Sequence, residues 1–128
     1  MNTYYEKQLE NTKKFIQILN HFNKIGHRFP FICYSEYITI QITSLSQLSE
    51  ARKLIKTFYP DWKDRLKMIW CSGENALASW EDKNHELIQI RLKTSINEFP
   101  RKLLPNDSCH FQSKKVTEYD LVCKNANL

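Results

Sequence analysis

Two stretches of the chain alternate strictly between apolar and polar residues, as strands with one buried face do. From Tyr37 to Thr43 every second residue is isoleucine, and from Leu87 to Lys93 apolar residues again recur at every second position. Successive side chains of a strand point to opposite faces of a sheet, so one face packs and the other meets solvent. We therefore expect a half-buried sheet whose polar face, with Gln89, Arg91 and Lys93, is a candidate binding surface.

The first part of the chain has a different period. From Thr3 to Ile25 apolar residues recur at spacings of three and four, which predicts one long amphipathic helix. Thr3 and Glu6 match a capping box at its start, and Gly26 occupies the position where a left-handed residue commonly ends a helix.

Short polar turns separate the remaining predicted elements and favour antiparallel neighbours. These elements are strands at Phe29 to Tyr34 and Tyr37 to Thr43, a helix capped by Ser44 or Ser46 that ends at Pro60, strands at Leu66 to Cys71, Ala76 to Trp80 and Leu87 to Thr94, a short helical turn within Glu98 to Leu104, and strands at Cys109 to Ser113 and Tyr119 to Cys123. The order predicts an α+β fold: a mainly antiparallel sheet of about five to seven strands with two longer helices packed on one face. We expect residues 1–128 to form a single globular domain.

Composition narrows the class of partner. The 128 residues carry a net charge of +5, with 41% hydrophobic and 12% aromatic residues. The hydrophobic and aromatic content is typical of a folded domain. The positive charge favours an anionic partner, but net charge alone identifies no ligand.

The chain shows no apolar run long enough to cross a membrane and no secretory signal, so we expect a cytoplasmic protein without a membrane partner. In a reducing compartment its four cysteines are expected to be free thiols. Cys109 and Cys123 are expected to lie opposite each other in the last hairpin, and their pairing would become possible if the strands are in register.

Catalytic and cofactor patterns are missing from the sequence. Two isolated glycines, Gly26 and Gly73, exclude a glycine-rich phosphate loop, and the four histidines are scattered. The carboxylate pairs Asp61 with Asp64 and Glu81 with Asp82 lie beside lysine or arginine, which indicates a solvated surface. We therefore predict no enzyme activity, no cofactor and no metal site.

One segment interleaves aromatic and basic residues, as nucleic-acid-binding surfaces do. It contains Trp62, Lys63, Arg65 and Lys67, and the polar strand residues Gln89, Arg91 and Lys93 extend it. Nucleic-acid contact is the alternative to the leading hypothesis, a protein interface on the polar face of the sheet bordered by Tyr34, Tyr37, Trp62 or Trp80. An unpaired strand at Phe29 to Tyr34 leaves both a monomer and a homodimer open.

Several short segments resemble, in style and spacing, small proteins encoded by phages and prophages. They are Pro60 to Trp62, Ala78 to Trp80, Ile88 to Leu92, Phe99 to Leu104, Cys109 and Leu121 to Cys123, within about residues 37 to 124. A single-domain chain of that origin resembles anti-defence inhibitors, including anti-CRISPR proteins. That resemblance implies binding to a host protein or ribonucleoprotein effector and occlusion of its nucleic-acid or partner site. It transfers no residue role, and the charge of +5 departs from acidic mimics of nucleic acid.

Overall fold

The computed structural model describes residues 3–27, 29–34, 37–115 and 118–124, and it confirms the α+β class. The elements are α1 (Thr3–Ile25), β1 (Phe31–Cys33), β2 (Ile38–Ile42), η1 (Leu45–Gln47), α2 (Leu48–Lys56), β3 (Arg65–Ser72), β4 (Asn75–Glu81), β5 (Ile88–Ser95), η2 (Ile96–Glu98), η3 (Arg101–Leu103), β6 (His110–Lys115) and β7 (Glu118–Val122). Each predicted strand and helix is present, although α2 has only nine residues and ends before Pro60.

The strands form two sheets, where the sequence predicts one. Five strands follow the order β1-β2-β5-β4-β3, and β6 and β7 form a separate hairpin. The consecutive strands β3, β4 and β5 form the expected antiparallel meander, but β2 and β5 run parallel. A parallel pair needs a long crossover, and the chain supplies one because α2, β3 and β4 lie between β2 and β5.

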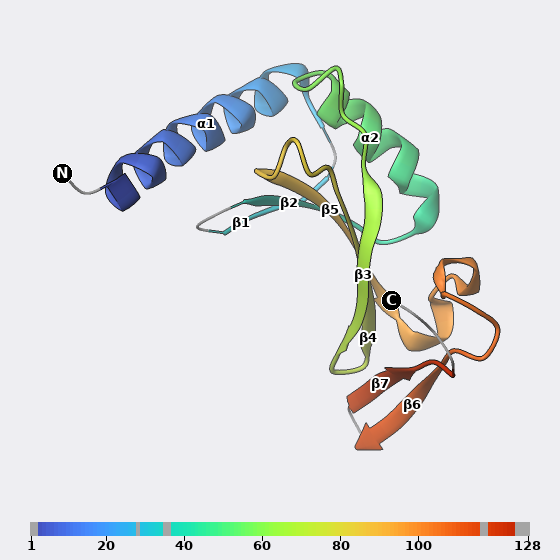
Figure 1. The fold of residues 1–128 in the computed structure, drawn as a ribbon. Coiled ribbons are helices and arrows are strands. Elements are labelled where there is room, and N and C mark those ends of the chain that lie inside the picture. Colours follow the sequence, from blue (N-terminus) through green and yellow to red (C-terminus); the bar gives the residue numbers. More distant parts are fainter. Residues whose placement is uncertain (1–2, 28, 35–36, 116–117, 125–128) are drawn as a thin grey trace.

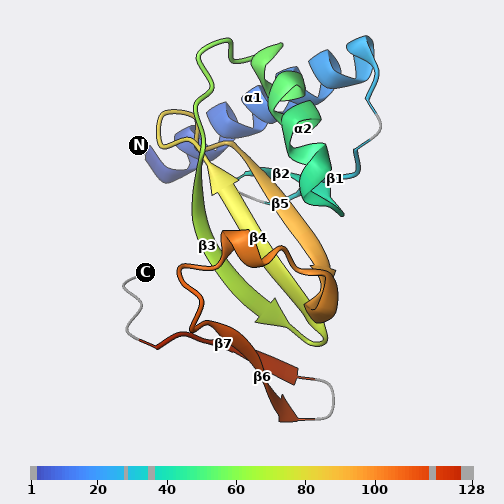
Figure 2. The same ribbon diagram turned by 90° about the vertical axis from the view of Figure 1, so that its right-hand side faces the viewer.

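Both helices lie on one face of the five-stranded sheet, and no described helix covers the other face (Figures 1 and 2). The apolar side chains of the alternating strands point toward the helices. In the parallel pair, Ile40 is the register partner of Ile90, and both are fully buried with Ile18 and Phe22 of α1. The period-two prediction for the apolar positions is therefore confirmed.

The polar positions divide in a way that the alternation does not predict. Lys93 is exposed and Gln89 and Arg91 are half-buried, but Thr39 is completely buried. Thr39 lies on an inner strand, so β1 and β5 flank it on both sides with Ile32 and Gln89 as its register partners. A strictly hydrated polar face is thus corrected to a partly covered one.

The sequence predicts where α1 ends. Thr3 is already helical in the structure, and the residues before it lie outside the described part of the chain, so the predicted capping box is not tested. At the other end Gly26 has φ 75° and its N–H donates to the Phe22 carbonyl at 3.1 Å. A glycine is needed there because other residues rarely adopt positive φ.

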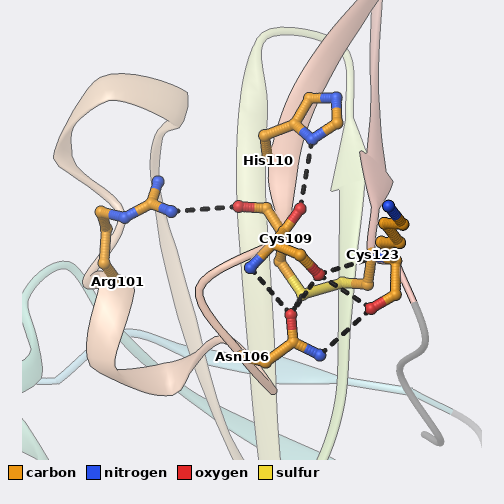
Figure 3. Close-up of a disulfide and its surroundings, with 7 residues drawn as sticks. Arg101, Asn106, Cys109, His110 and Cys123 are labelled. Carbon is orange, nitrogen blue, oxygen red and sulfur yellow. Dashed lines mark hydrogen bonds between the residues drawn. A yellow bond between two sulfur atoms is a disulfide. The ribbon is translucent and has the colours of Figure 1, made fainter.

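A disulfide between Cys109 and Cys123 closes the base of the β6–β7 hairpin (Figure 3). The Arg101 guanidinium donates to the Cys109 carbonyl at 3.0 Å, and the Ser108 hydroxyl donates to the Lys124 carbonyl at 2.8 Å. The expectation of free thiols is therefore wrong for this pair, because the hairpin register brings the two strands together directly beside both cysteines. Cys33 and Cys71 are free. Disulfides persist mainly in oxidising compartments, and the cytoplasmic location stays a prediction.

Reduction of this disulfide is expected to lower stability. The bond closes a loop with a sequence separation of 14, for which a loss of about 2 to 4 kcal/mol in the free energy of unfolding is typical. Urea unfolding with and without dithiothreitol measures the loss. The double variant Cys109→Ala/Cys123→Ala should no longer respond to reductant, whereas the control Cys33→Ala should respond like the original protein. An equal midpoint in both conditions for the original protein would contradict the prediction.

Candidate binding surface on the open face of the sheet

One face of the five-stranded sheet lies opposite the helices, and we call it the open face. One side-chain register of each strand builds it. Its residues are Ile32 on β1, Thr39 and Gln41 on β2, Gln89, Arg91 and Lys93 on β5, Leu77, Ser79 and Glu81 on β4, and Arg65, Met68 and Trp70 on β3. The register pairs Arg91 with Ser79 on one side and with Gln41 on the other. Arg91 therefore lies at the centre of this face.

Two aromatic rings hold the Arg91 guanidinium in place. Its Cζ atom lies 5.5 Å from the centroid of the Tyr34 ring and 5.3 Å from that of Trp70. One terminal nitrogen donates to the Tyr34 hydroxyl at 2.9 Å, and the other donates to Gln89 Oε1 at 3.3 Å. Such cation–π contacts orient an arginine while leaving its charge intact.

The open face also carries polar atoms that the described residues leave without a partner. Arg91 Nε and Thr39 Oγ1 are both buried and have no acceptor or donor within the described part of the chain. Each such atom costs about 1 to 3 kcal/mol when it is left unsatisfied. Unsatisfied polar atoms are commonly found at the functional sites of native proteins. The presence of both atoms on the open face therefore supports this face as a candidate site.

The charge of the open face is positive. Arg65, Lys67, Arg91 and Lys93 are opposed by a single carboxylate on the described strands of this face, Glu81. Lys67 lies at a β-bulge and pairs with Glu81 at 3.0 Å, which offsets part of the charge on β3. Excess charge remains around Arg91 and Lys93 on β5.

Not all of the sequence-predicted site residues share this surface. Gln89, Arg91, Lys93 and Arg65 belong to the open face, and Lys67, at the β-bulge, reaches it through its ion pair with Glu81. Trp62 does not, because its side chain is only 4% exposed and belongs to the hydrophobic core on the helical side. Its ring is therefore not accessible for stacking on a base or a partner side chain.

Lys63 also lies outside the open face, although it belongs to the basic segment of the sequence. It precedes β3 in the connection from α2, and its backbone N–H donates to the carboxylate of Asp82 at 2.8 Å. Its side chain is exposed, but it does not belong to a strand of the open face.

A buried polar cluster explains the position of Trp62. The indole N–H donates to Asp64 Oδ2 at 2.7 Å, and Arg52 on α2 binds both oxygens of the same carboxylate. The Asp64 side chain is 2% exposed, so the prediction of a solvated carboxylate is wrong here. Its two oxygens are filled by donors, which identifies Asp64 as a structural residue that joins α2 to the start of β3.

Asp82 is a second buried carboxylate, at the turn after β4. Burial alone would raise its pKa, but hydrogen bonds from the backbone N–H groups of Asn84 and Lys63 outweigh burial, and the charges of His85 and Lys83 add to them. The pKa of Asp82 is consequently lowered from its ordinary value of 3.8. A carboxylate held ionised by backbone donors is a turn-stabilising group and a poor general acid.

Other titratable groups of the described residues are held in local contacts. His85 stacks on Tyr59 at 4.0 Å between ring centroids and contacts Asp61 at 2.9 Å, while His21 contacts Thr57 at 2.9 Å. Burial, and then the negative charge of Asp120, raises the pKa of the Cys71 thiol, so this cysteine is not an activated nucleophile. No group of three or more potential metal ligands occurs among the residues that the structure describes.

Trp70 is the principal surface residue that the sequence does not single out. Its strand, β3, contains the bulge between Leu66 and Met68, which interrupts the alternating period that would reveal its face. Tyr34 is suggested only as a bordering aromatic residue, because its contact with Arg91 joins positions 57 residues apart.

Comparison with protein-family models, curated proteins and solved structures finds no significant match to this chain. Within the described residues, neither helix combines the length and the apolar character that crossing a lipid bilayer requires.

Replacing Asp82 should reveal its structural role through pH. Because its pKa is lower in the folded protein, the ionised carboxylate stabilises the fold above about pH 4, and this contribution is lost as pH falls through the folded pKa. Asp82→Asn should therefore lower the free energy of unfolding by about 1 to 3 kcal/mol at pH 7. The difference from the original protein should shrink at pH 3, as measured by urea unfolding.

The matched control is Asp107→Asn, because Asp107 is exposed. It should leave stability unchanged at both pH values. A difference for Asp82→Asn that is the same at pH 7 and pH 3 would exclude ionisation of this carboxylate as its cause.

Proposed function

We propose that this chain is a non-catalytic protein that binds another macromolecule through the open face of its sheet. The observation that carries the proposal is the Arg91 guanidinium, which lies between Tyr34 and Trp70 at the centre of a face that no described helix covers. Arginine and aromatic side chains contribute most of the binding energy at many protein interfaces.

The chemistry of this surface favours an acidic partner. Arg91 and Lys93 supply positive charge, and Met68 and Tyr34 supply exposed apolar and aromatic area beside it. An oriented guanidinium loses less conformational freedom on binding than a free one, which favours recognition of carboxylates.

In its most concrete form the proposed partner is a host defence effector, a protein or a ribonucleoprotein. Binding would then inhibit the effector by occluding its nucleic-acid or partner site. This form depends on the resemblance to phage-encoded inhibitors together with the positive charge of the open face, which suits an acidic patch on the effector.

Direct nucleic-acid binding is the second candidate. Arg91 and Lys93 can neutralise phosphates, and the exposed part of Trp70 lies beside them for base stacking. Burial of Trp62 weakens this candidate, because it removes the aromatic residue of the basic segment from the surface.

Charge reversal on β5 tests the proposal. Arg91→Glu/Lys93→Glu should reduce retention of a purified partner at least about tenfold, because two favourable charge contacts become repulsive. The partner is first recovered with the original protein from host lysate and identified by mass spectrometry. Binding is then measured with purified components by isothermal calorimetry.

The matched control is Lys56→Glu, an exposed position on α2 on the helical side of the sheet. It should bind like the original protein. Trp70→Ala separates the aromatic contribution from charge. Unchanged affinity in both the double variant and Trp70→Ala, with unaltered circular dichroism, would contradict an interface on the open face.

Salt dependence distinguishes the two candidates. Retention of single-stranded or duplex DNA that falls steeply with salt, and is lost in Arg91→Glu/Lys93→Glu, would favour nucleic acid. A modest effect of salt on a protein complex would favour the leading proposal.

A further inference from the structure

A second surface, on α1, is independent of the open face. Along the outer side of this helix Tyr5, Leu9 and Ile16 are 65%, 58% and 52% exposed, and Thr12 lies between Leu9 and Ile16. We call these four residues the α1 stripe. Their spacings of four, three and four place them on one side of the helix, as in the contact seam of a coiled coil.

The α1 stripe is distinct from the face that α1 packs on the sheet. The buried residues of α1 are Ile18 and Phe22, and both lie in its second half. Figure 1 shows the first turns of α1 extending beyond the sheet. A short helical segment without packing is marginally stable in water, so the first half of α1 gains from a partner.

Thr12 is compatible with burial against another helix. Its hydroxyl donates to the Gln8 carbonyl at 2.9 Å within α1 itself. Covering Thr12 would therefore leave no hydroxyl donor unsatisfied, and its methyl group would face the partner.

The charges beside the stripe indicate which partner fits. Glu6 and Lys13 each follow a stripe residue, Tyr5 and Thr12, so both lie on the same flank and both are exposed. When two identical helices pack antiparallel, the same flank of each meets the other. Glu6 of one copy then faces Lys13 of the second copy, and this contact occurs twice by symmetry.

The same arrangement matches the sizes of the stripe residues. Centring an antiparallel pair between residues 9 and 12 sets Leu9 against Thr12 of the second copy, and Tyr5 against Ile16. A parallel pair would instead place each residue beside its own copy and would leave Glu6 and Lys13 without opposite charges. Charge and size therefore both favour the antiparallel pair.

We infer that the α1 stripe is a self-association surface on which a second copy of this chain packs antiparallel. The interface is small, because few apolar side chains contribute on each copy, compared with about 800 Å² per partner in a standard interface. The dimer is consequently weak and forms in the micromolar range or above.

Sedimentation equilibrium from low micromolar to about 1 mM protein measures the association. The original protein should show a monomer–dimer equilibrium. Leu9→Gln/Ile16→Gln should remain monomeric, because glutamine retains helix propensity but removes the apolar contact. The matched control Lys14→Gln, away from the stripe, should associate like the original protein, and circular dichroism checks that each variant is folded.

Charge reversal identifies the orientation and the occupant. Glu6→Lys alone and Lys13→Glu alone should each raise the dissociation constant about tenfold, because both symmetric contacts become repulsive. A mixture of these two variants should regain association, since every lysine then faces a glutamate.

Two outcomes would overturn the inference. One is a monomer at every concentration. The other is a mixture of Glu6→Lys and Lys13→Glu that associates no better than either variant alone.

Discussion

The parallel contact between β2 and β5 is the constraint on which the rest of the sheet depends. It joins two strands that are far apart in the sequence and aligns three apolar residues of each, all of which are completely buried. Burial of each such side chain contributes about 1.5 to 3 kcal/mol. Because side chains alternate along a strand, fixing these residues toward the helices also fixes Gln89, Arg91 and Lys93 on the opposite face. The core therefore determines the composition of the candidate binding surface.

A second set of contacts fixes the corner of the molecule beyond the sheet. Asp64 joins Arg52 of α2 to Trp62, and Asp82 accepts one hydrogen bond from the chain that leads into β3. Asp64 lies in the segment that the sequence marks as basic and aromatic, and Asp82 binds to the backbone of that segment at Lys63. Their burial shows why charged residues near a tryptophan do not by themselves indicate a binding surface: here their donors and acceptors are used within the fold.

The sequence predicts the local elements well because their signals are local. Alternation identifies β2 and β5, and helical spacing with Gly26 identifies α1 and its end. Parallel pairing of β2 with β5 and separation of the β6–β7 hairpin from the larger sheet depend on contacts between distant segments, and no residue pattern encodes these. The sequence does place Cys109 opposite Cys123 in the last hairpin, but the bond between them depends on the exact register of the two strands. The polar strand residues are predictable because they follow from local alternation. The approach of Tyr34 and Trp70 to Arg91 is not predictable, because it joins segments that are distant in the sequence.

The two proposed surfaces are compatible because they lie on different parts of the fold. The α1 stripe belongs to a helix on the covered side of the sheet, and the open face lies on the other side (Figure 1). Pairing through α1 therefore leaves both open faces accessible. A weak dimer with two such faces would bind a partner that carries repeated acidic sites more tightly than either face alone, because the second contact becomes intramolecular. The small size of the α1 interface then has a physical consequence: binding to a repetitive partner also stabilises the dimer, since the two equilibria are linked.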